Sequence, residues 1–311
     1  MPAASAPPPD FDPAAAYPEM GRLRAALTAP DWPEVRALVA AAPGPVARTM
    51  LTQYAATVPG AELFLPDVLA RDADDAVAAA VLGGRLITMG WAVRSSAPAA
   101  YVSQEQFRTF RDFLVRAERV LIDATARHPA DPALWSQRLL SARGLGFGLA
   151  EVRRRYDRLA EHDPHHLPAQ GHLLQSLCPK WGGTWQQMHA FAHECMLAAP
   201  PGAPNAVLVV TGHLERWLAD DAHLASPEVR TEIYEAAARS VWDPGFGNDH
   251  GWAGVRNTFA MAFSLLGDHR AAAGQFTELG RCASEHPWHF LGDPAEVFVT
   301  RRAQAYAKAG L

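Results

Sequence analysis

The sequence predicts an all-α protein, and three features of the chain support this prediction. Apolar residues recur at helical spacing, most clearly where Phe107, Phe110 and Leu114 form one stripe. Signals for β-strands are nearly absent, because the chain has no run of alternating β-branched residues and no Asn-Gly or Asp-Gly turn. Prolines that would end a helix recur at intervals of 35, 36, 44 and 43 residues, at Pro129, Pro164, Pro200, Pro244 and Pro287.

These intervals predict a repeat architecture. Periods of about 34 to 45 residues that hold two helices each are typical of an α-solenoid. The segment from Leu266 to Ala272, followed by Phe276 and Leu279, resembles the turn and second helix of a tetratricopeptide repeat (TPR). We therefore expect a TPR-like, right-handed α-solenoid of antiparallel helix pairs. The expected pairs are residues 132–144 with 149–161, 167–178 with 184–198, 204–219 with 227–241, and 251–266 with 269–283, followed by a last helix over 294–309.

The part of the chain before residue 128 is less regular. Residues 1–16 are rich in Pro and Ala, which predicts a disordered arm. The expected helices cover residues 17–29, 32–42, 45–57, 61–70, 75–94 and 105–126. Ser103 and Gln106 predict a capping box at the start of the last of these, and Pro227 after Ser226 marks another helix start. Because no linker separates the two parts, we expect residues 17–311 to form one continuous domain, with divergent helices over 17–127 and clearer TPR-like pairs over 128–311.

The composition limits the possible partners and location. The chain has 311 residues, 49% of them hydrophobic and 20% charged, and a net charge of −5. This charge gives no basic footprint, so we expect no nucleic-acid partner. Three cysteines and an N-terminus without signal-peptide features predict a cytoplasmic protein. Residues 76–93 are apolar, but a membrane span with Arg85 at its centre would cost at least ~2.5 kcal/mol, so we expect a buried helix and no membrane partner.

A family resemblance covers less than half of the chain, from Trp91 to Trp217. The segment Lys180-Trp181-Gly182-Gly183, followed by Phe191-Ala192, is its most specific part; the other matching segments are 91–94, 142–145, 163–165, 199–202 and 213–215. Here the chain resembles an uncharacterised, largely actinobacterial family of helical proteins known only as a domain of unknown function. The resemblance implies a TPR-like helical fold, and it implies no activity.

Four polar residues fall at equivalent positions of the expected repeats. Arg138, His172, His213 and Asn257 stand on the first helix of each pair, 34, 41 and 44 residues apart. First helices line the concave face of such an array, so these side chains predict a polar groove for a peptide or an anionic ligand. The alternative is that this position of each repeat is simply polar and exposed.

Two further segments offer ligand-binding or structural roles. Lys180 and Trp181 lie in an expected helix–helix turn, where a cation beside aromatic rings can bind an anion or a planar ligand. The same tryptophan can instead fill the core between repeats, with the glycines allowing the tight turn. Arg94, like Arg85, lies on the most apolar helix and needs a carboxylate partner, for which Glu118, Asp123 and Glu151 are candidates.

Signals for catalysis and cofactors are weaker. His189 and His193 stand at i, i+4, a spacing that can bind zinc or copper, but the His-Glu-x-x-His pattern is absent. We therefore expect no metal and no other cofactor. The acidic segment from Asp72 to Asp75 matches the Asp-x-Asp-Asp pattern of class II terpene cyclases, yet it also suits a helix N-terminus.

The sequence thus predicts a TPR-like binding module for an unknown protein, peptide or small molecule. The alternative is an enzyme of specialised metabolism with a pocket inside the helical array. Its lining would be Arg94, His172, Lys180, His213 and Glu215, with His172 or His213 as general base and Glu215 as a further catalytic candidate.

Overall fold

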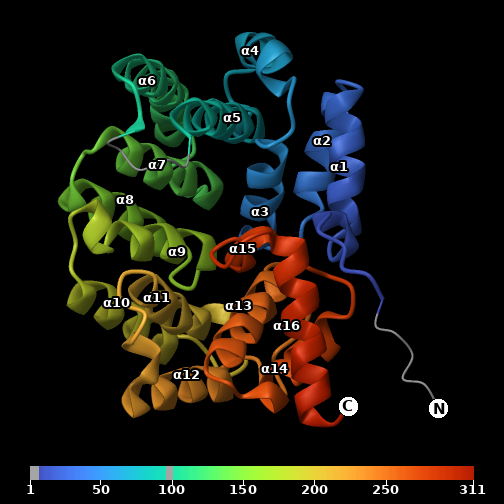
Figure 1. The fold of residues 1–311 in the computed structure, drawn as a ribbon. Helices are drawn as coiled ribbons and strands as arrows, with labels where there is room; N and C mark the ends of the chain where they lie inside the picture. The colour runs from blue at the N-terminus through green and yellow to red at the C-terminus, as the bar shows by residue number, and fades with distance from the viewer. Residues whose placement is uncertain (1–6, 96–100) are drawn as a thin grey trace. The chain divides into compact units, whose positions relative to one another are not determined.

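The computed structural model describes residues 7–95 and 101–311, and its named elements in these residues are all helical (Figure 1). The only other regular feature among them is an isolated bridge between Asp10 and Cys282. The all-α prediction is confirmed. Contacts divide the chain into two compact units, one formed by residues 19–183 and the other by residues 184–311 together with the N-terminal segment up to Pro18.

The unit of residues 19–183, called the first unit here, contains nine α-helices and one 3-10 turn in its described part. They are α1 (Pro18–Thr28), α2 (Trp32–Ala40), α3 (Pro45–Ala55), α4 (Ala61–Arg71), α5 (Ala76–Arg94), α6 (Gln104–Arg127), α7 (Pro132–Leu145), α8 (Leu149–Ala160), α9 (Leu167–Ser176) and η3 (Pro179–Trp181). The expected change of regularity at residues 127–128 falls inside this unit, between α6 and α7, which pack against each other.

Helix α5 is the central element of the first unit and packs against α3, α4, α6 and α7. Its small residues allow this, because a Cβ at Gly83 would lie 2.6 Å from the side chain of Leu121 on α6. A Cβ at Gly84 would likewise lie 2.8 Å from the Cβ of Ala56. Glycine costs helix propensity, and here close helix packing explains its presence.

The second unit, formed by residues 184–311 and the N-terminal segment, contains the remaining described helices. They are η1 (Pro13–Ala15), α10 (Trp185–Ala198), η4 (Pro204–Ala206), α11 (Val207–Trp217), η5 (His223–Ala225), α12 (Pro227–Arg239), α13 (Trp252–Leu265), α14 (His269–Leu279), α15 (Glu285–Trp288) and α16 (Pro294–Ala309). Helix α11 packs on α10, α12 and α13, and α13 packs on α14. Helix α16 packs on α14 and α15. The most deeply buried large side chains of this unit are aromatic: Trp288, Phe259, Phe263, Phe276 and Phe298.

The described part of the N-terminal segment makes specific contacts within the second unit. Residues 7–16 belong to the arm that the sequence predicts to be disordered, and residues 1–6 of that arm lie outside the described residues. Asp10 donates its backbone N–H to the carbonyl of Arg281 at 2.7 Å and accepts from the N–H of Ala283 at 3.0 Å. The ring of Tyr17 stacks on that of His250 with centroids 5.0 Å apart. These backbone and ring contacts tie the segment to the C-terminal half of the chain.

The helix boundaries follow local sequence signals closely. Ser103 and Gln106 form the predicted capping box, in which the Ser103 hydroxyl accepts from the Gln106 N–H at 3.1 Å. Pro227 occupies the first turn of α12 after the N-cap Ser226, as expected. Pro129, Pro164 and Pro200 each follow a helix end within a few residues, but Pro287 lies inside the short helix α15, which the sequence did not predict.

The charge of Arg85 in the apolar helix α5 is paired with a carboxylate of a neighbouring helix. The guanidinium Nε of Arg85 donates to Glu62 Oε2 at 2.7 Å, so its partner is a residue of α4 and none of the three expected carboxylates.

Helix α5 is long and apolar enough to cross a membrane by length and composition alone, and 56% of its most apolar window is buried inside the protein. Core helices of soluble proteins have the same two properties, so this feature is weak support for a membrane span.

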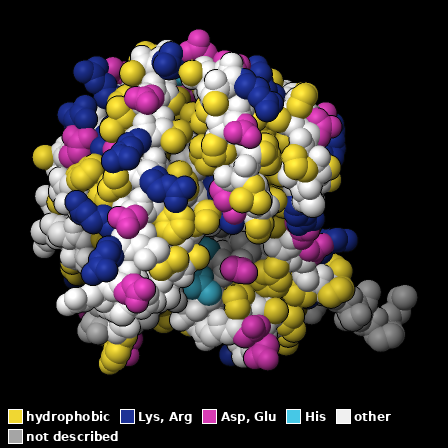
Figure 2. All heavy atoms as spheres, turned by 90° about the horizontal axis from the view of Figure 1, so that it is seen from above, with side chains coloured by type: hydrophobic (Ala, Val, Ile, Leu, Met, Phe, Trp, Pro, Cys, Tyr) yellow, Lys and Arg dark blue, Asp and Glu magenta, His cyan; other side chains and the backbone are white. Residues whose placement is uncertain are grey.

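The face of the protein seen in Figure 2 carries charges of both signs. On the face seen in Figure 2, Lys and Arg side chains alternate with Asp and Glu side chains and do not gather into one large basic area. This distribution agrees with the net charge of −5.

Candidate functional site

The predicted polar column is divided between the two units. Arg138 and His172 belong to the first unit, while His213 and Asn257 belong to the second.

Arg138 is buried in an ion-pair network between α6, α7 and α8. Its guanidinium lies 3.6 Å from the carboxylate of Glu118, which also accepts hydrogen bonds from Arg155 at 2.7 Å and from Ser141 at 2.7 Å. Burial alone would raise the pKa of Glu118, but these contacts hold that pKa below its usual value. Arg138 thus helps to join three helices.

His172 also makes its polar contact inside the first unit. Its Nε2 lies 3.1 Å from the amide nitrogen of Gln53 on α3. Burial, with the nearby charges of Arg143 and His166, lowers the pKa of His172 to about 3. The ring is therefore neutral at physiological pH, and Nε2 accepts from the Gln53 amide.

Trp181 of the Lys-Trp-Gly-Gly segment and Arg94 both contact the indole ring of Trp91. The rings of Trp91 and Trp181 meet edge to face with centroids 6.0 Å apart. The guanidinium of Arg94 lies 5.6 Å from the centre of the Trp91 ring, and that of Arg143 lies 5.5 Å from the centre of the Trp181 ring. Lys180 is exposed on η3. The structure thus brings Arg94 and Trp181 to the same indole ring, where stacking and helix packing are combined.

Asn257 and Glu215 are buried in the second unit. The side-chain amide of Asn257 donates to the carbonyl of Ala253 at 2.8 Å, and its oxygen accepts from the indole of Trp288 at 2.8 Å. Asn257 thereby connects α13 to α15. Glu215 on α11 acts on His286, whose pKa burial lowers to about 4 while the charge of Glu215 opposes this shift.

His213 lies in a cluster of histidines that the column prediction did not contain. Nδ1 of His213 is 2.9 Å from Nε2 of His223, and the ring centroids of His189 and His213 are 4.7 Å apart. Nε2 of His213 donates to Oε2 of Glu232 at 2.9 Å, and His193 donates to the same oxygen at 3.1 Å. The ring of His189 therefore lies beside that of His213. His193 is linked to His213 only through Glu232, to which both are hydrogen-bonded.

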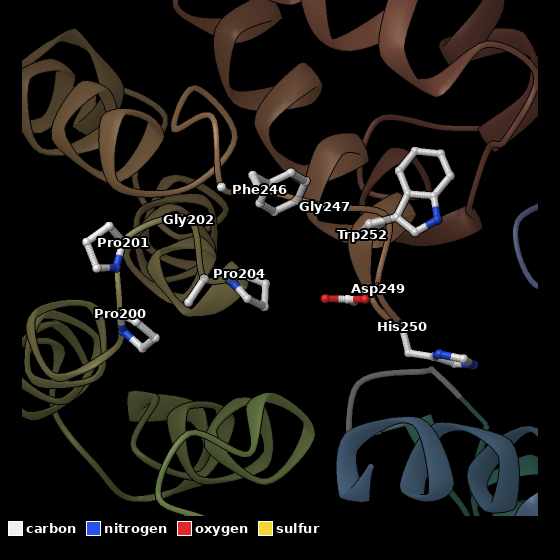
Figure 3. A pocket seen from close by; sticks show the side chains of 11 residues that line it. Pro200, Pro201, Gly202, Pro204, Phe246, Gly247, Asp249, His250 and Trp252 are labelled. Atoms are coloured by element: carbon white, nitrogen blue, oxygen red, sulfur yellow. The ribbon is translucent and has the colours of Figure 1, made fainter. Parts of the chain in front are cut away.

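A surface pocket of about 280 Å³ lies between two loops of the second unit (Figure 3). One wall is the loop from Pro200 to Pro204, and the other is the segment from Gly245 to Trp252. In Figure 3 the side chain of Asp249 points toward Pro204 on the opposite wall. The ring of His250 points in another direction, away from Pro204. The pocket therefore combines one carboxylate with proline, glycine and aromatic surfaces.

Glycine permits the close approach of the two pocket walls. A Cβ at Gly202 would lie 2.6 Å from the carbonyl carbon of Gly245, and Gly202 has a φ of 76°. Its backbone N–H donates to the carbonyl of Arg239 at 3.0 Å. On the other wall, the Tyr17 hydroxyl accepts from the N–H of Gly251 at 2.8 Å, which fixes the loop that carries Asp249.

Sequence reasoning missed His223, Glu232 and the loop pocket. The i, i+4 pair of His189 and His193 was a usable signal for His189. His223 comes from a different element, and no short sequence pattern links it to that pair. The pocket depends on two loops more than 40 residues apart in the chain, which have no shared motif.

Comparisons with known proteins add no family to these observations. No protein-family model, no curated protein and no solved structure matches the chain.

Proposed function

We propose that the second unit is a TPR-like binding module that holds a small ligand or the end of a peptide in the loop pocket. Helix α11 packs on α10 and α12, and α13 packs on α14. Helices α13 and α14 are separated by only the three residues Leu266 to Asp268, as in antiparallel helix pairs. The pocket at the junction of two inter-helix loops carries this proposal, because ligand sites are concave and combine apolar walls with few polar groups.

The chemistry of the pocket favours an occupant with a positively charged or N–H-donating group. Asp249 supplies a carboxylate that can accept hydrogen bonds and attract a cation. Phe246 and Trp252 supply aromatic surface for an apolar or planar part next to that group. The volume of about 280 Å³ suits a small molecule or one terminal segment of a peptide.

We place the binding site in this pocket and not along the column of repeat positions. Arg138 and Asn257 already make hydrogen bonds that hold neighbouring helices together. A ligand would have to replace those bonds, and breaking a buried polar network is costly. The pocket needs no such rearrangement.

The pocket supports binding better than catalysis. Its lining contains neither His213 nor Glu215, the catalytic candidates of the second unit, and His250 stacks on Tyr17. Acid–base catalysis would need a base and an acid that converge on one reacting group.

A ligand screen by thermal shift and calorimetry tests this proposal. The library should pair cationic amines with anionic analogues of the same shape, and should include short peptides. We expect cationic ligands to bind wild type and to lose at least about tenfold in affinity in Asp249→Asn, because the charge-assisted hydrogen bond is lost. The control Asp221→Asn, an exposed carboxylate of the same unit, should bind as wild type does. Preference for anions, or equal binding by Asp249→Asn, would contradict the proposal.

A further inference from the structure

Three histidine side chains of the second unit converge on one point. His189 lies on α10, His213 on α11 and His223 at the start of η5. One ring nitrogen of each lies within 4.8 Å of those of the other two. The closest pair is Nδ1 of His213 and Nε2 of His223, at 2.9 Å. Because the three rings come from separate elements, tertiary packing and not a local sequence motif brings them together.

Glu232 determines which nitrogen of His213 is available. Its Oε2 accepts from Nε2 of His213 at 2.9 Å, so Nε2 carries the proton and Nδ1 presents its lone pair toward His223. Metal-binding histidines commonly have such a carboxylate on their far nitrogen, where it fixes the tautomer and raises the basicity of the ligand. His193 donates to the same oxygen at 3.1 Å and holds Glu232 in place.

The ring of His189 supplies an independent indication of a ligand-binding site. Both of its ring nitrogens are shielded from solvent, and neither has a hydrogen-bond partner among the described residues. Buried polar atoms without partners are rare in folded proteins and call for a specific explanation. A bound cation would accept the lone pair that no protein group uses. Gly212 of α11 lies next to this ring, since a Cβ there would meet Nδ1 of His189 at an ordinary contact distance of 3.4 Å.

The electrostatic environment keeps the three rings neutral, as metal ligands must be. Burial lowers the pKa of His189 and of His213 to about 4, and it also lowers the pKa of His223. The other charged or titratable groups that act on the cluster are Arg216, which opposes a cation, and Glu232, Asp220 and His193. Protons therefore compete little for these nitrogens near pH 7.

We propose that His189, His213 and His223 together bind one divalent transition-metal ion, represented by Zn²⁺, and that Glu232 positions His213 without contacting the ion. Imidazole nitrogen is a ligand for zinc, copper and nickel, whereas magnesium and calcium prefer oxygen. In a tetrahedral site with Zn–N bonds of about 2.0–2.1 Å, the nitrogens lie roughly 3.4 Å apart. The present separations, from 2.9 Å to at most 4.8 Å, reach that geometry through small side-chain movements.

Binding also requires one change of tautomer. Because Nδ1 of His213 is unprotonated, Nε2 of His223 must carry the proton of the hydrogen bond between them. For Nε2 to bind the ion, this proton moves to Nδ1 of His223, and the imidazole stays neutral. Three protein ligands leave the fourth position of a tetrahedral zinc site for water or for an exchangeable ligand.

The test is metal binding by the untagged full-length protein. Wild type, stripped with a chelator, is titrated with Zn²⁺ and Co²⁺ in competition with a chromophoric chelator, and we expect one equivalent to bind. His189→Asn, His213→Asn and His223→Asn should each lose at least about tenfold in affinity. His162→Asn removes an exposed histidine of the first unit, and it should bind like wild type. Circular dichroism shows which variants are folded.

A spectroscopic measurement on wild type keeps the test decisive if a variant fails to fold. X-ray absorption of the loaded protein should report three imidazole ligands on the ion. Absence of a stoichiometric metal, fewer than three imidazoles, or undiminished affinity in folded triad variants overturns the proposal. The metal titration and the X-ray absorption measurement do not depend on the loop pocket, because the pocket is tested with organic ligands and Asp249→Asn.

Discussion

The Nε2 atom of His213 donates a hydrogen bond to Oε2 of Glu232 across 2.9 Å, which joins α11 to α12. The same oxygen accepts from His193 on α10, so one carboxylate connects three helices of the second unit. Partial burial would raise the pKa of Glu232, but the hydrogen bonds from the two histidines hold that pKa below its usual value. Glu232 is therefore ionised at neutral pH and keeps His213 in one tautomer.

We predict that Glu232→Gln weakens zinc binding by about 10- to 100-fold without removing any ligand, because the carboxylate behind a metal-bound histidine contributes on this scale. Competition with a chromophoric chelator measures the change. Glu235→Gln alters an exposed carboxylate of the same helix and serves as the matched control. Unchanged affinity in Glu232→Gln would show that the carboxylate does not act on a metal ligand.

The buried Glu118 carboxylate should be essential to the first unit. Glu118→Ala leaves the guanidinium groups of Arg138 and Arg155 buried without their shared partner, which should lower the free energy of unfolding by about 3–5 kcal/mol. Urea unfolding followed by circular dichroism measures this loss. Glu161→Ala removes an exposed carboxylate paired with Arg158 and should have little effect. Equal effects of the two substitutions would argue against the structural role of the network.

Acidification should destabilise the protein through its buried histidines. Burial lowers the pKa of His166 to about 4, below the ordinary value of 6.5, so the unfolded chain binds more protons between these pH values. The free energy of unfolding therefore falls as the pH drops from about 7 toward 4, by up to ~1.4 kcal/mol per pH unit for each such histidine. Its Nδ1 also accepts from the Ala169 N–H at 3.2 Å, a contact that a proton on Nδ1 would break.

His166→Asn tests this titration, because asparagine can still cap α9 through its side-chain oxygen but does not titrate. Urea unfolding between pH 4.5 and 7.5 should show a shallower dependence on pH than in wild type, by up to about one proton. His162→Asn, at an exposed position in the same unit, should leave the slope unchanged. A His166→Asn slope equal to that of wild type would contradict the assignment.

The two glycines of the Lys-Trp-Gly-Gly segment should differ in their tolerance of alanine. A Cβ at Gly183 would lie 2.0 Å from the carbonyl oxygen of Leu177, so Gly183→Ala forces the backbone to move and should cost more than about 3 kcal/mol. Gly182 has a φ of 96° but open space around it, so Gly182→Ala should cost only about 1–2 kcal/mol. Thermal unfolding of the two variants gives the ranking, and the reverse order would contradict the packing described here.

Local signals were sufficient for the helices. Asp131, Ser103 and Asp293 each cap a helix through the side chain, and such bonds reach only two or three residues along the chain. The partners of buried charges could not be read in the same way. Arg85 pairs with Glu62 of α4 and not with Glu118, Asp123 or Glu151, the candidates named from the sequence. The partner depends on which helices pack together.

The sequence by itself determined the all-helical fold and nearly all helix positions, because helix propensity, caps and prolines act within one or two turns. It also supplied single members of the later sites, such as His189 and His213. Only the tertiary structure decided that His223 completes a cluster with them, that Glu232 orients one of its rings, and that two distant loops enclose a pocket. The physical reason is that these arrangements depend on contacts between elements distant in the chain, which packing selects and local sequence does not encode.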